Sequence, residues 1–576
     1  MSKLVWIHKF NNNELGISET DGTGRGSFCL VPVDARSIFP ELSEMNDFKS
    51  GVKLYINRAF RREVNFSKPA SKTEYRLSLP QEIQRDDSGV ALIDGNTIAS
   101  IYQYEDGVNI DINNNQLNLS EFLEEFRARR GSNNSIAEFV VDEIIDENLN
   151  FFDASENVRL SKPFLLLAGI SGTGKTRFVR EQAKVSGSLS ENYSLISVRP
   201  DWHEPSDLLG YISYLSGSTK YITTDVLNFI VKAWKRIIDS DLILQVENID
   251  GYGDRFIVSG NHEQLSQVPP FWLCLDEMNL APVEQYFADY LSVLETREWI
   301  WNEGRFKYTT DPLLKASILN QVENKECLRE QLGLAEPKYD EAWNLFLVHG
   351  LGIPFNLIVA GTVNMDETTH GFSRKVIDRA LSFDFGEFFP ADYNHYFESS
   401  TQNKTLTYPI FSYVKISNLP VIDASGEKSI GFLKLINQVL DKTPFKLAYR
   451  ALNELLLAVV SQKPTTHTDL IAVWDDFLMC KVLPRIEGDN DKLMNDRSHE
   501  SLLQQLCALI QDEFLKLAPT SHVSNEDGGV IIQRVDLYRQ LVSGENRQLL
   551  VKSRSLEKLR WMQNRLENFG FTSFWP

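Results

Sequence analysis

The feature that most constrains the fold of this chain is a glycine-rich segment, Gly-Ile-Ser-Gly-Thr-Gly-Lys-Thr, at residues 169–176. It follows the apolar run PFLLLA, which is typical of a buried strand, and it precedes RFVREQAKV, which has helical spacing. A loop between a strand and a helix can surround a phosphate with backbone amides and the N-terminus of the helix. The sequence therefore predicts an α/β fold with a phosphate-binding loop.

Each residue type in this loop has a chemical use. The three glycines let the backbone wrap around a phosphate without interference from a Cβ atom. The ammonium group of Lys175 is expected to reach the β- and γ-phosphates of a nucleotide, and the hydroxyl of Thr176 is expected to bind Mg²⁺. The residues predicted to bind nucleotide are Gly169, Ile170, Ser171, Gly172, Thr173, Gly174, Lys175 and Thr176.

Two later apolar runs end in polar residues that suit the same chemistry. FWLCL leads into Asp276 and Glu277, about 100 residues after the loop. We expect Asp276 to hold Mg²⁺ through its water shell and Glu277 to polarise an attacking water molecule. LIVAGTV leads into Asn364, whose amide is expected to orient that water or contact the γ-phosphate. Each pattern is common when taken alone, and their order and spacing after the loop favour the catalytic interpretation.

Phosphoryl transfer also needs positive charge on its transition state, which an arginine can supply from a neighbouring subunit. The segment GFSRKVIDRAL offers Arg374 and Arg379, and FKLAYRALNEL offers Arg450. We expect Arg379 to act between subunits and Arg450 to act within its own subunit. A structural or solvated ion pair is the alternative for each of them.

Patterns along the chain predict four regions. Residues 1–118 are rich in short β-like runs and are predicted to form a β-rich recognition domain. Residues 119–159 have helical spacing and are predicted to be a helical linker. Residues 160–390 alternate strands and helices, which favours a parallel sheet. Residues 391–576 are predicted to be a mainly helical lid and C-terminal region.

The N-terminal region contains Arg58, Arg61 and Arg62 among aromatic residues, in the run LYINRAFRREVNF. Basic residues that alternate with aromatic ones can hold phosphates and stack on bases, so these arginines are candidate nucleic-acid contacts. A half-buried strand with a solvated basic edge is the alternative.

Composition limits the partners. The net charge is −20, from 59 basic and 79 acidic residues, so any DNA contact is expected to be local. No run approaches the ~20 apolar residues of a membrane helix. Without a recognisable signal peptide, we expect a cytoplasmic protein with no membrane contact. The five cysteines have no CxxC spacing, and the sequence therefore does not indicate a zinc site.

Taken together, the motifs resemble the McrB-type branch of AAA+ proteins, close to the dynein-related and MoxR-like ATPases. The resemblance rests on GISGTGKT, VRPDWHEPSDLLGY, LDEMNLAPVEQYFADYLSVLETRE and GTVNMDETTHGFSRKVIDRA, and in the tail on KVLPRIEG and LRWMQNRLENFGFTSFW. It covers about residues 160–576. It implies an AAA+ P-loop parallel sheet with a helical C-terminal lid region, to which this chain adds its β-rich N-terminal domain.

The resemblance also implies roles and partners. Glu277 becomes the catalytic glutamate and Asn364 the first sensor, while Arg379 or Arg374 completes the neighbouring site and Arg450 is the second sensor. The implied assembly is a hexameric ring that binds a nucleotide with Mg²⁺ between its subunits. Its implied partners are DNA, often modified and bound by the N-terminal module, and a McrC-like nuclease subunit.

The chain also departs from McrB. ALSFDF lacks the arginines that McrB carries after its sensor segment, and Met365-Asp366-Glu367 replaces Thr-Ala-Asp after the sensor asparagine. McrB prefers GTP, whereas nothing in this sequence requires guanine, so ATP is expected and GTP stays open. Two further functions stay open. One is a MoxR-like ATPase that remodels protein complexes, and the other is a slow, nucleotide-gated scaffold.

Overall fold

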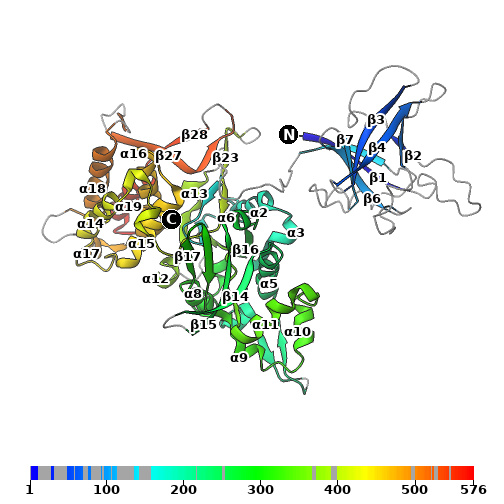
Figure 1. Ribbon diagram of the computed structural model, residues 1–576. Coiled ribbons are helices and arrows are strands. Elements are labelled where there is room, and N and C mark those ends of the chain that lie inside the picture. Colours follow the sequence, from blue (N-terminus) through cyan, green and yellow to red (C-terminus); the bar gives the residue numbers. More distant parts are fainter. Residues whose placement is uncertain are drawn as a thin grey trace, which may run out of the picture. The chain divides into compact units, whose positions relative to one another are not determined.

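The structure is a computed structural model, shown in Figure 1. Before residue 157 it describes residues 2–10, 28–31, 48–56, 59–68, 75–79, 93, 97–104, 107–112 and 135–141. From residue 157 it describes all residues except 216, 250–252, 366–371, 391–398, 495–499, 520–521, 525–529, 544–546 and 576. The chain divides into two compact units, Met1–Glu147 and Asn148–Pro576, which we describe separately.

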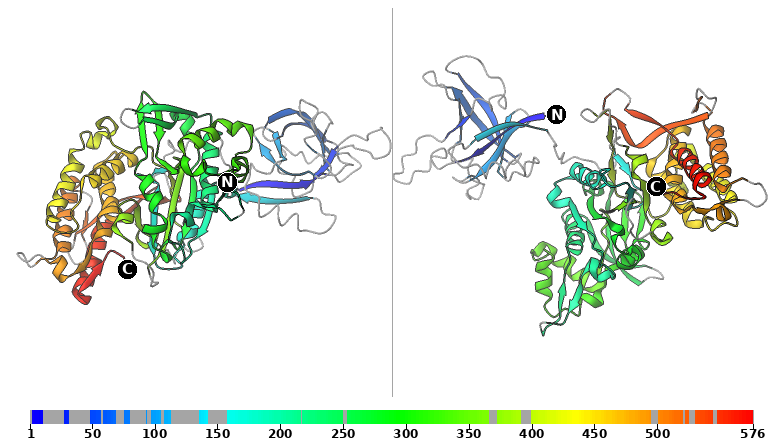
Figure 2. Two further views of the ribbon diagram at one scale, coloured as in Figure 1. Left: turned by 90° about the horizontal axis from the view of Figure 1, so that it is seen from below. Right: turned by 180° about the vertical axis from the view of Figure 1, so that it is seen from behind.

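The N-terminal unit is built on one curved, eight-stranded sheet (Figure 2). Its strand order is β2-β5-β4-β3-β7-β6-β1-β8, and the neighbours pair antiparallel except for β3 with β7. The strands are β1 (Ser2–Lys9), β2 (Phe28–Val31), β3 (Phe48–Ile56), β4 (Ala59–Lys68), β5 (Tyr75–Ser78), β6 (Ile98–Tyr104), β7 (Gly107–Asp111) and β8 (Ser135–Val141).

A period of two in burial explains this sheet. On β3, Val52, Leu54 and Ile56 are all buried, and on β4 the same holds for Val64 and Phe66. Residues two apart on a strand lie on one face, so these side chains build a core of their own for the N-terminal unit.

The prediction of a helical linker over residues 119–159 is wrong at residues 135–141, the first residues of this range that the structure describes. β8 (Ser135–Val141) pairs antiparallel with β1 and is the last strand of the N-terminal sheet. Its sequence SIAEFVV has three β-branched residues, which favour a strand over a helix. Residues 119–134 and 142–156 of the predicted linker lie outside the described residues. The second unit begins at Asn148.

A five-stranded sheet forms the centre of the second unit. Its strand order is β11-β16-β21-β10-β22, and every neighbouring pair is parallel. The strands are β10 (Phe164–Gly169), β11 (Tyr193–Ser197), β16 (Phe271–Asp276), β21 (Leu357–Asn364) and β22 (Leu381–Asp384). β10, β21 and β22 are buried along their whole length, which is typical of a parallel sheet covered on both faces.

Two helices lie against this sheet. α2 (Lys175–Ser186) begins directly after the loop that follows β10, and it packs on β16. α5 (Asp225–Ile238) packs on β11 and β16. Because the strands are parallel, their carboxyl ends meet at one edge of the sheet. In open α/β sheets this edge is where ligands bind.

A second, antiparallel sheet is inserted around β16. Its order is β14-β15-β18-β17, from β14 (Ile243–Ile249), β15 (Gly253–Asn261), β17 (Glu298–Asn302) and β18 (Arg305–Thr309). Figure 1 shows it beside the helices α9 (Ala316–Leu319), α10 (Lys325–Gln331) and α11 (Asp340–His349).

The C-terminal region contains more strand than the helical prediction for residues 391–576 allowed. Its long helices are α14 (Glu427–Val439), α15 (Tyr449–Gln462), α16 (His467–Phe477), α18 (Leu502–Leu517) and α19 (Arg554–Phe569). They share this region with β23 (Thr401–Asn403), β26 (His522–Ser524), β27 (Val530–Leu541) and β28 (Gln548–Lys552). These strands form one antiparallel sheet around β27.

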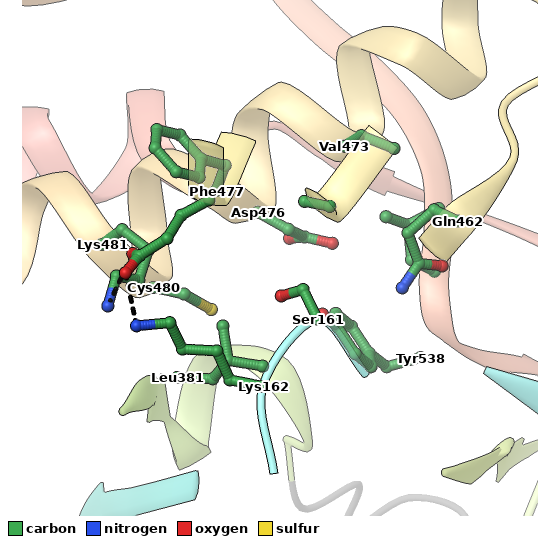
Figure 3. Close-up of a pocket in the computed structure, with 13 residues that line it drawn as sticks. Ser161, Lys162, Leu381, Gln462, Val473, Asp476, Phe477, Cys480, Lys481 and Tyr538 are labelled. Carbon is green, nitrogen blue, oxygen red and sulfur yellow. Dashed lines mark ion pairs between the residues drawn. The ribbon is translucent and has the colours of Figure 1, made fainter. Parts of the chain in front are cut away.

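The C-terminal region contains two clusters of buried charges, and the first attaches it to the parallel sheet. In the first, Glu454 on α15 forms ion pairs with Lys162, which precedes β10, and with Lys481, 2.9 Å away. Figure 3 shows the two ammonium groups meeting beside a cavity of about 20 Å³. Burial and the neighbouring Lys481 lower the pKa of Lys162 to about 8. This site holds two positive charges for one carboxylate.

The second cluster joins three elements of the C-terminal region. Arg534 on β27 contacts Asp475 and Asp476 at the end of α16, and Arg554 on α19 contacts Asp476 and Asp536. Although burial opposes ionisation, Arg534 and the surrounding hydroxyl groups hold the pKa of Asp475 below its usual range. Removing Arg534 would leave the buried Asp475 without an ion-pair partner among the described residues, whereas Asp476 would keep Arg554.

Candidate functional site

The loop predicted to bind phosphate connects β10 to α2 at the carboxyl edge of the parallel sheet. Gly172 and Gly174 have φ angles of +79° and +87°, a left-handed conformation that glycine adopts without strain. The buried Lys175 turns its Nζ back into the loop, where it donates to the carbonyl oxygens of Gly169, 3.0 Å away, and Ile170, 2.7 Å away. The loop therefore gathers a positive charge at its centre.

Next to this loop, hydroxyl groups from two elements converge on the carboxylate of Asp276, which ends β16. The hydroxyl groups of Thr176 on α2 and Thr362 on β21 both donate to Oδ1 of Asp276, each over 2.7 Å. Oxygen donors of this kind are the ligands that Mg²⁺ prefers. The residues present therefore fit a magnesium ion held by Thr176, Asp276 and the phosphates of a nucleotide. Among the described residues, no group of three or more His, Cys, Asp or Glu side chains could hold a metal by itself.

Glu277 follows Asp276 in a left-handed conformation, with φ of +52°. Its backbone N–H donates to Thr362 Oγ1, 2.9 Å away, and its Oε1 accepts from the amide of Asn364, 3.3 Å away. Asn364 is buried at the end of β21, and its backbone carbonyl oxygen accepts from the side-chain amide of Asn279. The structure thus brings Asp276, Glu277 and Asn364 together beside the loop.

Thr362 is a site residue that the sequence analysis missed. It lies two positions before Asn364 on β21, on the same face of the strand, and it bonds both Asp276 and Glu277. The sequence did contain an indication of this role. Thr362 is the one residue with a hydroxyl group in the run LIVAGTV, and it lies two positions from Asn364, so both point to the same face of a strand.

The three predicted arginines lie elsewhere. Arg450 and Arg379 both contact Glu295 at the end of α8 (Ala288–Leu294), with nitrogen–oxygen distances of 2.9 and 3.7 Å. Arg374 donates to the carbonyl oxygen of Pro444 and lies over the ring of Phe445. In the described part of the chain, none of the three forms a hydrogen bond or ion pair with the loop at residues 169–176.

The N-terminal arginines are only partly described. Arg61 is half-buried on β4, and Arg62 follows it on that strand, where its register partner is Leu54. Arg58 lies outside the described residues.

A pocket of about 580 Å³ opens on one side of the loop. Gly169, Ile170 and Thr173 form one wall, and residues of β27, β28 and α19 form another. The size is within the usual range for small-molecule sites. The C-terminal region and the predicted phosphate-binding loop therefore line the same pocket.

Comparison with known proteins adds one match. Residues 404–571 match the family described as a domain of unknown function (DUF8727), which covers α14 to α19 and both long strands of the C-terminal sheet. No curated protein matches the chain. Within the described residues, no helix has both the length and the apolar character that crossing a membrane requires.

Proposed function

We propose that this chain is a nucleoside triphosphatase of the AAA+ type that hydrolyses ATP, or GTP, with Mg²⁺. The observation that carries the proposal is the convergence of Lys175, Thr176, Asp276 and Glu277 at the carboxyl edge of a parallel sheet. A glycine loop, a lysine, a hydroxyl group and two acids in this arrangement are the parts that phosphoryl transfer to water uses.

The proposed mechanism assigns one task to each group. The loop amides and the N-terminus of α2 bind the phosphates, and Lys175 moves its ammonium group from the loop carbonyls to the phosphate oxygens. Magnesium, held through Thr176 and Asp276, would neutralise the negative charge that phosphoryl transfer develops. Glu277 accepts a proton from the attacking water, and Asn364 keeps the Glu277 carboxylate in position.

The same proposal extends to the assembly and its target. From the resemblance of its motifs to McrB, we propose a cytoplasmic, hexameric motor of a restriction or phage-defence system that acts on DNA with a McrC-like nuclease subunit. The net charge of −20 means that DNA contact would be confined to a local surface, for which Arg61 and Arg62 on β4 are candidates.

Steady-state hydrolysis of ATP and of GTP, with and without double-stranded DNA, tests this function. We expect magnesium-dependent turnover that DNA increases and that Lys175→Ala abolishes together with nucleotide binding. Turnover that DNA leaves unchanged would favour the protein-remodelling alternative. Tight nucleotide binding by Lys175→Ala would overturn the assignment of the loop.

Mixed rings test the proposed role of Arg379. Arg379→Ala alone is expected to lose hydrolysis, because its guanidinium would complete the site of a neighbouring subunit. Mixing it with Lys175→Ala, which is defective in the loop, should restore part of the turnover. Arg450→Ala, which removes the other arginine on Glu295, is the matched comparison. Absence of restoration would assign Arg379 to its ion pair with Glu295.

A further inference from the structure

The C-terminal region matched by DUF8727 forms a cationic wall facing the loop. On that wall the pocket of about 580 Å³ is lined by Arg539, Val551, Lys552, Arg554, Glu557, Lys558 and Trp561, while Asp384 and Glu387 line it from the segment around the end of β22. Four of these seven side chains are positively charged and one is acidic, and Gly169, Ile170 and Thr173 of the loop line the same pocket. A ligand that occupied both the loop and this pocket would carry negative charge.

Three of these cations either form ion pairs with buried acids or are exposed to solvent. Arg554 is held by Asp476 and Asp536 and donates to the carbonyl oxygen of Glu387. Arg539 is paired with Asp536 at 2.9 Å. Lys552 is exposed at the end of β28. Each arginine would have to give up an ion pair with a buried acid to turn toward a ligand.

Lys558 differs from the other three. Its side chain is 5% exposed, and within the described residues its Nζ forms one hydrogen bond, to Oδ2 of Asp384, 2.6 Å away. An ammonium group has three N–H donors, so two remain for a ligand. The rings of Trp561 and Phe574 lie beneath the Nζ at 4.1 and 4.9 Å and keep the charge in place.

Asp384 places this lysine at the loop. Asp384 ends β22 in parallel register with Ala168, the residue before Gly169. The Nζ of Lys175 bonds the carbonyl oxygens of Gly169 and Ile170, which also line the pocket. Two ammonium groups are thus associated with the same end of β10, one from α2 and one from α19.

We propose that Lys558 binds the terminal phosphate of a nucleoside triphosphate held by the loop, while Asp384 positions its ammonium group. This inference rests on the proposed function and adds to it a residue that distinguishes triphosphate from diphosphate. It also gives the DUF8727 region a task, because α19 would sense the terminal phosphate and transmit its loss through Arg554 to the buried acids on α16 and β27.

Nucleotide affinities of the full chain with Mg²⁺ test the proposal, using the fluorescent probes mant-AMPPNP and mant-ADP. Lys558→Met is expected to weaken mant-AMPPNP binding at least tenfold and to change mant-ADP binding less than threefold. Lys558→Arg should keep most of the preference for the triphosphate. Lys516→Met, which removes an exposed lysine paired with two acids on α18, should leave both affinities unchanged.

The outcomes separate the two proposals. If the unaltered chain binds neither probe, the proposed function fails. If it binds both and Lys558→Met weakens both equally, nucleotide binding stands and the role of Lys558 is overturned. Asp384→Asn covers the case in which Lys558→Met does not fold, because it retains the lysine and removes its only carboxylate partner among the described residues. We expect it to reduce the preference for mant-AMPPNP, because the ammonium group loses the carboxylate that positions it, and an unchanged preference would also overturn the role.

Discussion

At the scale of single residues, Glu277 combines an unfavourable backbone with a well-held side chain. A left-handed conformation costs a residue with a Cβ atom roughly 1–2 kcal/mol. Here the Thr362 hydroxyl accepts from its N–H, and the Asn364 amide donates to its carboxylate. Gly361 adds room, because a Cβ there would collide with the sulfur of Met278. Strain that several partners maintain is common at functional sites.

Glu277→Gln tests the role of this carboxylate. Glutamine keeps the shape and the contact with Asn364 but cannot accept a proton, so hydrolysis should fall roughly 10²–10⁴-fold while nucleotide binding is retained. Turnover and mant-nucleotide affinity, measured on the same preparation, separate the two effects. Glu284→Gln, an exposed acid seven residues further on, is the control. Normal turnover in Glu277→Gln would remove Glu277 from the mechanism.

Thr362→Val tests the hydroxyl that connects the two acids. Valine keeps the volume, but it leaves the Glu277 N–H without an acceptor and Asp276 with one hydroxyl fewer. We expect about tenfold slower hydrolysis, a higher magnesium requirement and a loss of roughly 1–3 kcal/mol in stability. Thr362→Ser should restore most of each property. A Thr362→Val protein with unchanged magnesium dependence would contradict this role.

Individual residues also show what the sequence could predict. The loop, Asp276, Glu277 and Asn364 could be placed because each follows an apolar run, and parallel strands bring such ends to one edge. Thr362 was missed because a hydroxyl inside an apolar strand resembles an ordinary β-branched residue. The contacts of Arg379 and Arg450 depend on Glu295, whose position comes from tertiary packing that no local pattern encodes.

At the scale of elements, β27 shows why the C-terminal sheet was not predicted. Its residues alternate in burial, but the buried positions include Arg534, Asp536 and Gln540, while Val535 and Leu537 are half-buried on the other face. A hydropathy pattern would predict that the apolar face of this strand is buried and its charged face exposed, which is the reverse of what the structure shows. The charges are tolerated inside because acids and arginines of α16 and α19 pair with them.

The Lys162–Glu454–Lys481 cluster gives an element-scale prediction about how α15 is attached to β10. Glu454→Gln leaves two buried ammonium groups together and should cost about 3–5 kcal/mol, whereas Lys162→Met leaves a neutral Lys481–Glu454 pair and should cost much less. The shift in urea midpoint of each variant measures the difference. Equal shifts would show that charge balance does not control this contact.

The same cluster predicts a pH dependence. The folded pKa of Lys162 is about 8, below the value of about 10.4 for an exposed lysine. Between these values the unfolded chain holds a proton that the folded chain has released, so raising the pH stabilises the fold. The stability of the unaltered protein relative to Lys162→Met should therefore rise from about pH 8 to about pH 10.5. A difference that stays constant across this window would contradict the lowered pKa.

At the scale of the whole molecule, the two units are independent of each other in their cores, whereas the DUF8727 region is part of the second unit. The N-terminal unit has its own core, and the second unit has another. The DUF8727 region is not separable in this way. Its strand β24 (Thr405–Thr407) pairs with β9 (Asn157–Arg159). Its Lys558 contacts Asp384 at the end of β22, and its Arg554 donates to the carbonyl oxygen of Glu387 just after that strand.

Expression of fragments tests this difference. Residues 148–576 should unfold cooperatively and bind nucleotide as the full chain does. Residues 404–571 alone should lack a cooperative transition, because β24 loses its partner strand and Lys558 loses Asp384. Circular dichroism during thermal unfolding measures both. A sharp transition in the short fragment would show that the region folds by itself.

The pairing of β9 with β24 also has a consequence for synthesis of the chain. The two strands pair in parallel although they are about 250 positions apart. At ~5–20 residues per second, β9 leaves the ribosome roughly 12–50 s before its partner exists. The loop that begins ten residues after β9 emerges early as well, while Lys558 is made near the end. The nascent chain therefore exposes an unpaired strand edge while about 250 of its 576 residues are made, and the pocket beside the loop closes only when α19 is released.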